Sequence, residues 1–229
     1  MQAYIPAIRT SMLALALCSL ANQSELAAMK RKLPVSKALK AHLEVFMLSS
    51  YLQGNHMMEN TTKYVGQGAD INAQYMWGNS QDTLLHMAIN KHDRLASNQI
   101  PFIQFLFGEN ASCNIQNSLG QTPLHRAVRD PELVILLTQQ GADTNIADNL
   151  GNTPLQRVIT GTDFVANDAT RLTVVQLLAP QASLQNLYRG IVLAVACNRH
   201  EIAAFLCQYL VFRSPGKTKL SDVKFFFEN

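Results

Sequence analysis

A short motif that begins with threonine recurs along this chain. Residues 122–125 read Thr-Pro-Leu-His; residues 83–86, 39 residues earlier, read Thr-Leu-Leu-His; residues 153–156, 31 residues later, read Thr-Pro-Leu-Gln. Self-similarity at a period of about 33 residues indicates a solenoid, which is a stack of similar structural units. A solenoid acts through its extended surface, so the repeat favours a binding protein over an enzyme.

A similar preface of five residues stands before each motif. It reads Gly-Ala-Asp-Ile-Asn at 68–72, Asn-Ala-Ser-Cys-Asn at 110–114 and Gly-Ala-Asp-Thr-Asn at 141–145. Each preface leads to a glycine shortly before the threonine, namely Gly78, Gly120 or Gly151. The last preface residue and the fourth motif residue are eleven positions apart in the second and third copies but fourteen in the first. The first copy therefore carries three additional residues.

These residues resemble the ankyrin repeat, whose preface leads through a short hairpin and the threonine motif into two antiparallel helices. The resemblance covers about residues 43–211. It implies an all-α ankyrin-repeat solenoid, built of helix–turn–helix repeats with short β-hairpin fingers and preceded by an N-terminal helical extension. We expect the extension over 1–42, about five repeats over 43–72, 73–114, 115–145, 146–185 and 186–211, and a C-terminal tail over 212–229.

The motif and preface predict where helices begin and end. The motif threonines can cap the first helix of each repeat by accepting from free backbone N–H groups: Thr83, Thr122 and Thr153. Pro123 and Pro154 follow at the first helical position, where a missing N–H costs nothing. A left-handed residue is expected where each second helix ends, at Gly68, Asn110 and Gly141.

The resemblance also implies a role for the fourth motif residue. In the family this histidine faces the neighbouring repeat and braces its loops by hydrogen bonds. His86 and His125 are therefore expected to be structural residues rather than metal ligands. Gln156 can make a similar bond without titrating.

The two ends of the array depart from the motif. Residues 46–65 fit a first repeat without its threonine motif. In the last repeat, residues 193–196 (Leu-Ala-Val-Ala) replace the usual helix start. Atypical sequence is expected there, because a terminal repeat covers the core on one side only.

Composition and motifs argue against several functional classes. The net charge of +3 is too small to indicate nucleic-acid binding. Neither Gly-x-Ser-x-Gly, a phosphate-binding glycine loop nor His-Glu-x-x-His occurs, and the four cysteines have no metal-ligand spacing. Apolar residues make up 48% and charged residues only 15%, which leaves room for an uncharged binding surface. We therefore expect no enzymatic activity, cofactor or metal, and a monomer that binds a protein partner.

The N-terminal segment has two open interpretations. Arg9 precedes an apolar run of about ten residues that ends in Ser-x-Ala at 19–21, which is a plausible secretory signal over 1–21. Leu26 and Met29 continue the apolar face, which favours a structural helix. The run is too short to span a bilayer, so stable membrane insertion is not expected. We predict a cytoplasmic protein, including the host cytosol after secretion; the alternative is a periplasmic protein with a cleaved signal.

The segment after residue 32 has a further interpretation. Leu33-Pro34 and the apolar residues at 43–52 faintly resemble an F-box, which would make the chain an adaptor to a ubiquitin ligase. A helix that caps the solenoid explains the same residues, and we favour it because leucines at helical spacing are the ordinary core pattern.

The C-terminal tail ends with a cluster of apolar side chains. Ser214-Pro215-Gly216 stops the last helix, and Val223 and Phe225–Phe226–Phe227 follow. These side chains either fold back on the last repeat or are recognised by another protein. Bacterial effectors that resemble this chain often end in a secretion signal with apolar residues, which suggests a secreted effector that binds a host protein.

The partner-binding surface is expected on the fingers and the adjoining concave helix face. Trp77, Leu119 and Leu150 each stand immediately before a hairpin glycine and should align on successive fingers. Trp77 is the one tryptophan of the chain, and aromatic residues often dominate interface energetics. The full predicted set is Tyr75, Met76, Trp77, Asn90, Lys91, Ser118, Leu119, Gln121, Arg129, Asp130, Asn149, Leu150 and Asn152.

Overall fold

The computed structural model describes residues 58, 61–62, 65, 69–77, 80–90, 99–161 and 168–213. Within residues 69–90, strands β1 (Tyr75–Trp77) and β2 (Ser80–Asp82) pair as an antiparallel hairpin. Four helix pairs follow: α5 (Leu84–Ile89) with α6 (Gln99–Gly108), α7 (Pro123–Ala127) with α8 (Pro131–Gln139), α9 (Pro154–Thr160) with α10 (Asp168–Leu178), and α11 (Leu184–Ala196) with α12 (His200–Arg213).

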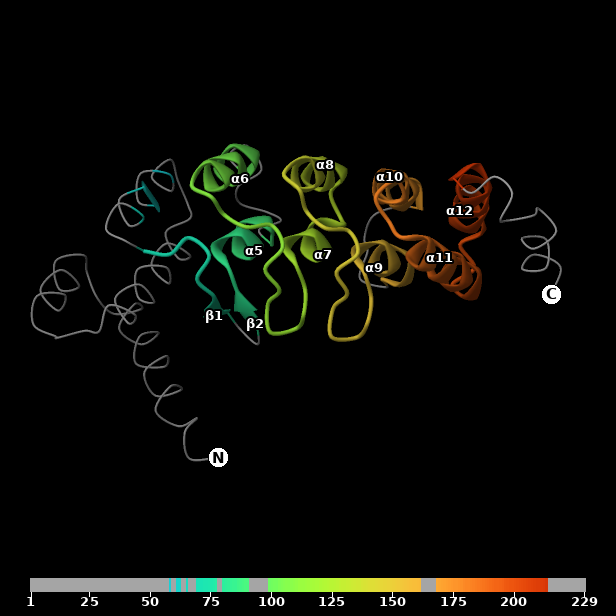
Figure 1. The fold of residues 1–229 in the computed structure, drawn as a ribbon, viewed down its shortest axis with the longest axis horizontal. Helices are drawn as coiled ribbons and strands as arrows, with labels where there is room; N and C mark the ends of the chain where they lie inside the picture. The colour runs from blue at the N-terminus through green and yellow to red at the C-terminus, as the bar shows by residue number, and fades with distance from the viewer. Residues whose placement is uncertain are drawn as a thin grey trace, which may run out of the picture.

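The helix pairs form two parallel layers. Helices α5, α7, α9 and α11 make one layer, and α6, α8, α10 and α12 make the other (Figure 1). Hairpin fingers project from the layer of first helices, so the molecule has a helical body with a fringe of loops along one side (Figure 1). This architecture confirms the predicted all-α ankyrin-repeat solenoid for the described part of the chain.

The motif threonines lie at the predicted helix starts. Thr83, Thr122 and Thr153 have extended backbone angles and immediately precede α5, α7 and α9. The predicted side-chain cap is made by Thr83, whose Oγ1 accepts from His86 N at 3.4 Å, whereas the hydroxyls of Thr122 and Thr153 do not accept from a backbone N–H of the first turn. Asn110 has a φ of 64° and Gly141 a φ of 82°, so each second helix of these repeats ends in the expected left-handed residue. Gly68 lies outside the described residues.

The core lies between the two helix layers and between successive pairs. The second helices of the first three pairs each contribute three side chains that are almost fully buried, at the spacing i, i+1 and i+4 of one helix face: Phe102, Ile103 and Leu106 in α6; Leu133, Val134 and Leu137 in α8; Val174, Val175 and Leu178 in α10. Full burial of each such side chain contributes about 1.5–3 kcal/mol to the free energy of folding. Because these side chains pack both within a helix pair and against the next pair, the stability comes from the stack of repeats.

The start of the last pair differs from the prediction. We expected residues 193–196 to begin its first helix, but α11 begins at Leu184 and those residues form its end. The hydroxyl of Ser183 caps α11 by accepting from the backbone N–H of Asn186 at 3.2 Å. Asn145 Oδ1 accepts from Ser183 N at 2.7 Å, just as Asn114 Oδ1 accepts from Asp143 N at 2.8 Å. Ser183 therefore occupies the position that Asp143 has in the preface of the previous repeat. Helix α11 starts at the point where the earlier repeats form a finger.

Several predictions concern parts of the chain that are not described. The N-terminal extension with its two interpretations, the F-box-like segment and residues 214–229 of the C-terminal tail all lie outside the described residues. The predicted start of the tail at 212 was two residues too early, because α12 continues to Arg213. Within the described residues, every helix is too short or too polar to cross a bilayer.

Candidate protein-binding ridge

An asparagine at the end of each preface clamps the next repeat. Asn72 Nδ2 donates to the carbonyl of Asn110 at 3.1 Å, and its Oδ1 accepts from Ser112 N at 2.7 Å. Asn114 makes the same pair of bonds to the Gly141 carbonyl at 3.1 Å and to Asp143 N at 2.8 Å. One amide side chain thus satisfies two backbone groups, which fixes the offset between neighbouring repeats.

Asn145 repeats the clamp on the last pair. Its Nδ2 donates to the Gln181 carbonyl at 3.0 Å, while its Oδ1 accepts from Ser183 N. Asn186 Nδ2 adds a third bond to the same Oδ1 at 2.9 Å. The clamp therefore continues into the pair that has no finger of its own.

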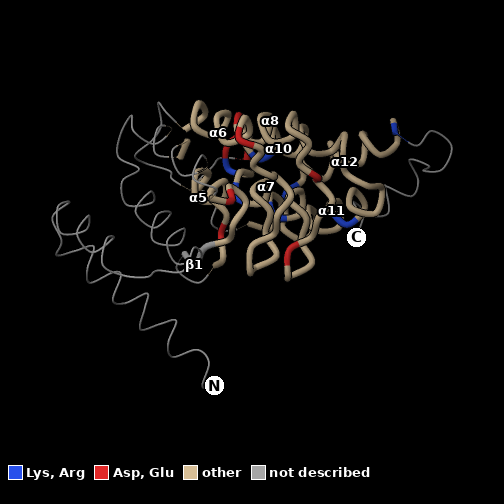
Figure 2. Tube along the Cα trace, turned by 60° about the vertical axis from the view of Figure 1, so that its left-hand side comes forward, with Lys and Arg blue, Asp and Glu red and all other residues tan. Residues whose placement is uncertain are grey.

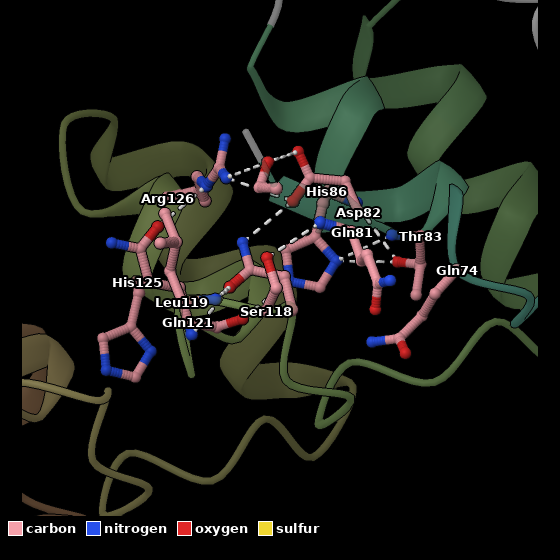
Figure 3. Close-up of polar contacts among 12 residues, drawn as sticks. Gln74, Gln81, Asp82, Thr83, His86, Ser118, Leu119, Gln121, His125 and Arg126 are labelled. Carbon is pink, nitrogen blue, oxygen red and sulfur yellow. Dashed lines mark hydrogen bonds and ion pairs between the residues drawn. The ribbon is translucent and has the colours of Figure 1, made fainter. Parts of the chain in front are cut away.

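The motif histidines connect each helix start to the following finger. His86 Nδ1 lies 2.8 Å from Thr83 Oγ1 and accepts from Thr83 N at 3.3 Å, while its Nε2 lies 2.9 Å from the Gln121 carbonyl (Figure 3). His125 makes the corresponding contacts, at 2.9 Å to Thr122 Oγ1, 3.1 Å to Thr122 N and 3.0 Å to the Asn152 carbonyl. The structural role that the family resemblance implied is confirmed for both.

These contacts define the protonation state of the rings. A carbonyl oxygen can only accept, so Nε2 carries the hydrogen, and Nδ1 is left to accept from threonine. Burial lowers the pKa of His86 from 6.5 to about 4 and also lowers that of His125. Both rings are therefore neutral at pH 7 and act as fixed hydrogen-bond bridges. In the third copy Gln156 Oε1 accepts from Thr153 N at 2.8 Å, and its Nε2 donates to Asn186.

The fingers are joined to one another by hydrogen bonds of backbone and side-chain groups. Gln81 N donates to Ser118 Oγ at 3.0 Å, which links the first finger to the second. Asn149 N donates to the Leu119 carbonyl at 3.1 Å, and Asn149 Nδ2 donates to the Ser118 carbonyl at 2.9 Å. The three fingers therefore form one hydrogen-bonded row instead of three independent loops.

A side chain within each of the last two fingers shapes its turn. Asn117 Oδ1 accepts from Leu119 N at 2.9 Å and from Gln121 N at 3.0 Å. Asp148 Oδ1 accepts from Leu150 N at 3.0 Å and from Asn152 N at 2.9 Å. Because Asx side chains replace backbone acceptors here, the tips keep the same conformation in both fingers.

A buried ion pair ties the first finger to the next repeat. The Asp82 carboxylate is buried, lies 3.1 Å from Arg126 Nη2 and accepts from Asn117 Nδ2 at 2.8 Å (Figure 3). Arg126 Nε also donates to Gln121 Oε1 at 3.0 Å. Burial lowers the pKa of Arg126, and Asp82 opposes that shift. The polar groups beneath the fingers are thus paired with one another.

Four residues at the tips of the second and third fingers are exposed to solvent. We define the finger ridge as Ser118, Leu119, Asn149 and Leu150, all of which are exposed. Leu119 is 44% exposed and Leu150 is 80% exposed, although both are large apolar residues. Because their backbones belong to the hydrogen-bonded row, the two leucines are presented in a fixed relation to each other.

The ridge is uncharged within a chain of low charge. None of its four residues is ionisable, and most of the described trace in Figure 2 carries neither Lys or Arg nor Asp or Glu. Two carboxylates near the fingers, those of Asp82 and Asp148, are buried and face Arg126 and Arg157. The exposed chemistry of the ridge is therefore apolar and amide-like.

The other predicted partner-binding residues fall into four groups. Asn90 and Arg129 are exposed at the ends of α5 and α7, as expected. Asp130 caps α8, where its Oδ1 accepts from Glu132 N at 2.9 Å. Gln121 is buried against Arg126, and Asn152 is half-buried beneath His125, so both support the fingers from inside. Lys91 and the side chains of Tyr75, Met76 and Trp77 lie outside the described residues.

Sequence reasoning missed the pairing beneath the fingers. A signal was available, because Arg126 and Arg157 each follow the fourth motif residue and recur 31 residues apart. Their partners could not be chosen from sequence, since Arg126 pairs with a residue 44 positions away in the previous repeat. The described residues contain no group of three or more His, Cys, Asp or Glu side chains that could hold a metal ion.

Comparison with known proteins agrees with this geometry. Residues 85–166 match the family model described as Ankyrin repeats (3 copies). That range covers the second, third and fourth predicted repeats in large part and includes the whole finger ridge. No curated protein is significantly similar to the chain. The fold and this match together show that residues 85–166 are built of ankyrin repeats.

Proposed function

We propose that this protein is a non-enzymatic interaction module that binds a protein partner through the finger ridge and the adjoining concave face of the first helices. The exposure of Leu119 and Leu150 on a hydrogen-bonded row of fingers carries the proposal. Large apolar side chains on rigid supports bury area on binding with little loss of conformational entropy. Asn90 and Arg129, at the ends of the first helices, would provide polar contacts at the edge of that interface.

The expected partner surface follows from the chemistry of the ridge. Since Ser118, Leu119, Asn149 and Leu150 carry no charge, the partner should present an apolar patch flanked by hydrogen-bonding groups. Trp77 and Lys91 remain proposed members of the interface on sequence grounds. A more specific role, a secreted bacterial effector that binds a host protein, rests on the family resemblance and on the apolar end of the tail.

Capture by matched variants tests the proposal. The full chain and a Leu119→Ser/Leu150→Ser variant would be used as bait, and bound proteins would be quantified by mass spectrometry. Ile135→Ser is the control, because Ile135 is an exposed apolar residue of α8, in the other helix layer. A genuine partner should be retained by the wild type and the control and reduced at least tenfold by the ridge variant. A partner bound equally by all three proteins would place the interface elsewhere.

Trp77→Ala provides an independent measurement on the same partner. An aromatic anchor at the centre of an interface contributes about 2 kcal/mol or more to binding. The variant should therefore bind at least about tenfold more weakly while its melting temperature stays near that of the wild type. Normal binding, or a large fall in the melting temperature, would show that Trp77 is a packing residue.

A further inference from the structure

Helix α11 exposes an apolar stripe. Leu184, Tyr188 and Val192 are 41%, 45% and 50% exposed, and they follow one another at intervals of four residues. Residues spaced by four lie on one face of a helix, so the three side chains form a continuous strip along α11. We call these three residues the α11 stripe.

Other sides of α11 contact α12 and the preceding repeat. A Cβ on Gly190 would meet Leu206 Cδ1 of α12 at 3.3 Å and Ile159 Cδ1 of α9 at 3.4 Å. At about 100° per residue, Gly190 lies about 160° around the helix from Tyr188. Arg189 Nη1 donates to the Gly151 carbonyl at 2.8 Å, and Asn186 accepts from Gln156, so these residues face the preceding repeat. The α11 stripe is thus turned away from that repeat.

The position of α11 explains why this face is open. In the described solenoid α5 contacts α7, α7 contacts α9 and α9 contacts α11, so each earlier first helix is covered by the next one. Helix α11 is the last of the described series. A terminal repeat normally carries a polar outer face because it must be soluble there. The α11 stripe departs from that rule, and packing of another apolar segment against it would remove its side chains from water.

The described chain ends near the start of the α11 stripe. Arg213 is the last residue of α12, and its guanidinium donates to the carbonyl of Ala182, two residues before Leu184. The stripe from Leu184 to Val192 is about 12 Å long, and an extended chain from Arg213 to Phe226 can reach about 40 Å. Residues 214–229 can therefore reach every part of the stripe.

The tail has the matching chemistry. Its apolar residues Leu220, Val223 and Phe227 recur at three- and four-residue intervals, and Phe226 lies beside them on the same side of a helical projection, whereas Phe225 falls on the other side. Lys217, Lys219, Asp222 and Lys224 supply polar positions between and before them. This pattern is amphipathic, and its apolar side is comparable in length to the α11 stripe.

We propose that residues 220–227 pack their apolar side against the α11 stripe and close the C-terminal end of the solenoid. The tail then substitutes for a polar terminal repeat. It also prevents a second copy from stacking on the open end, which keeps the chain monomeric. This proposal does not depend on the function of the finger ridge.

Thiol labelling of the full chain tests the contact. Tyr188→Cys would be made in the otherwise wild-type chain and in a chain with Phe226→Ser/Phe227→Ser, and maleimide labelling would be followed peptide by peptide. The native thiol of Cys197, which is exposed, is an internal reference in every sample. Labelling at position 188 should be at least tenfold faster in the tail variant. Gln176→Cys, at an exposed position of α10, should be labelled equally in both chains.

Disulfide trapping provides a second measurement that leaves the tail apolar. Val192→Cys/Phe226→Cys should form an intramolecular disulfide under mild oxidation, whereas Gln176→Cys/Phe226→Cys should not. Light scattering should show a monomeric wild type and self-association of the Phe226→Ser/Phe227→Ser variant. Equal labelling at position 188 with either tail, trapping equal to the control pair, or a wild-type dimer that shields position 188 would overturn the proposal.

Discussion

Asp82 and Arg126 belong to successive repeats, and their side chains meet at 3.1 Å beneath the fingers. The carboxylate is buried and the guanidinium is mostly buried, and each has further hydrogen bonds within the same cluster. The pair therefore connects the first finger to the next repeat from inside, while the tips that face solvent remain uncharged.

Removing the carboxylate should destabilise the solenoid. Asp82→Ala leaves Arg126 and the Asn117 amide without their shared acceptor in a buried site, so we expect the free energy of unfolding to fall by about 2–3 kcal/mol. Urea denaturation followed by circular dichroism measures the change. Glu132→Ala, which removes an exposed carboxylate from α8, should stay within about 1 kcal/mol of the wild type. Equal effects of the two substitutions would contradict a structural role for the ion pair.

The asparagine clamp should contribute measurably to stacking. Asn114→Ala removes two cross-repeat hydrogen bonds, to the Gly141 carbonyl and to Asp143 N, and should cost about 1–3 kcal/mol of unfolding free energy. Asn114→Asp keeps the acceptor but loses the donor, so its cost should be intermediate. Gln104→Ala, on the exposed face of α6, is the control and should change stability by less than about 0.5 kcal/mol. An Asn114→Ala variant as stable as the control would show that the clamp follows from stacking and does not support it.

Two glycines with positive φ should respond differently to alanine. Gly120 and Gly141 have φ angles of 72° and 82°, so either substitution costs about 1 kcal/mol of backbone strain. A Cβ on Gly120 would also lie 2.4 Å from Asn149 Oδ1 and 2.6 Å from Asn149 N, whereas at Gly141 it would meet no atom within 4 Å. Gly120→Ala should therefore be more destabilising by at least about 1 kcal/mol, measured by thermal and urea unfolding. Similar losses would mean that the second and third fingers do not pack as described.

Stability should fall in mild acid because of the motif histidines. The pKa of His86 is about 4 in the folded protein and 6.5 for the exposed side chain. Between pH 6.5 and 4 the unfolded chain binds a proton that the folded chain excludes, so stability decreases as pH is lowered through this window. The contribution of His86 to this loss at pH 4.5 should be about 2 kcal/mol.

A comparison of variants isolates that effect from other titrating groups. His86→Gln copies the residue found naturally at Gln156, which bridges the same positions without titrating. The difference in unfolding free energy between pH 7.5 and pH 4.5 should be smaller in His86→Gln than in the wild type. If the two proteins lose the same free energy of unfolding over this interval, burial does not keep the His86 ring neutral.

The sequence predicted most of the local structure, because its signals act over a few residues. A threonine cap, a proline at the first helical position and a left-handed residue such as Asn110 or Gly141 each fix the backbone of one turn. Their recurrence at a near-constant period then specified a stacked array. The same local logic failed at α11, because the apolar residues of 193–196 fit either the beginning or the end of a helix, and Ser183 was not recognised as a cap.

The tertiary structure decided which groups meet across repeats and which remain exposed. Whether Gln121 faces a partner or Arg126 depends on the offset between neighbouring fingers, and that offset is set by clamps such as Asn114. The exposure of Tyr188 was undetermined, since an apolar side chain at helical spacing is ordinarily buried. The repeat and the starts and ends of its helices could be predicted from the sequence, because backbone conformation depends on neighbouring residues. The finger ridge and the open face of α11 exist only once the repeats are stacked in register.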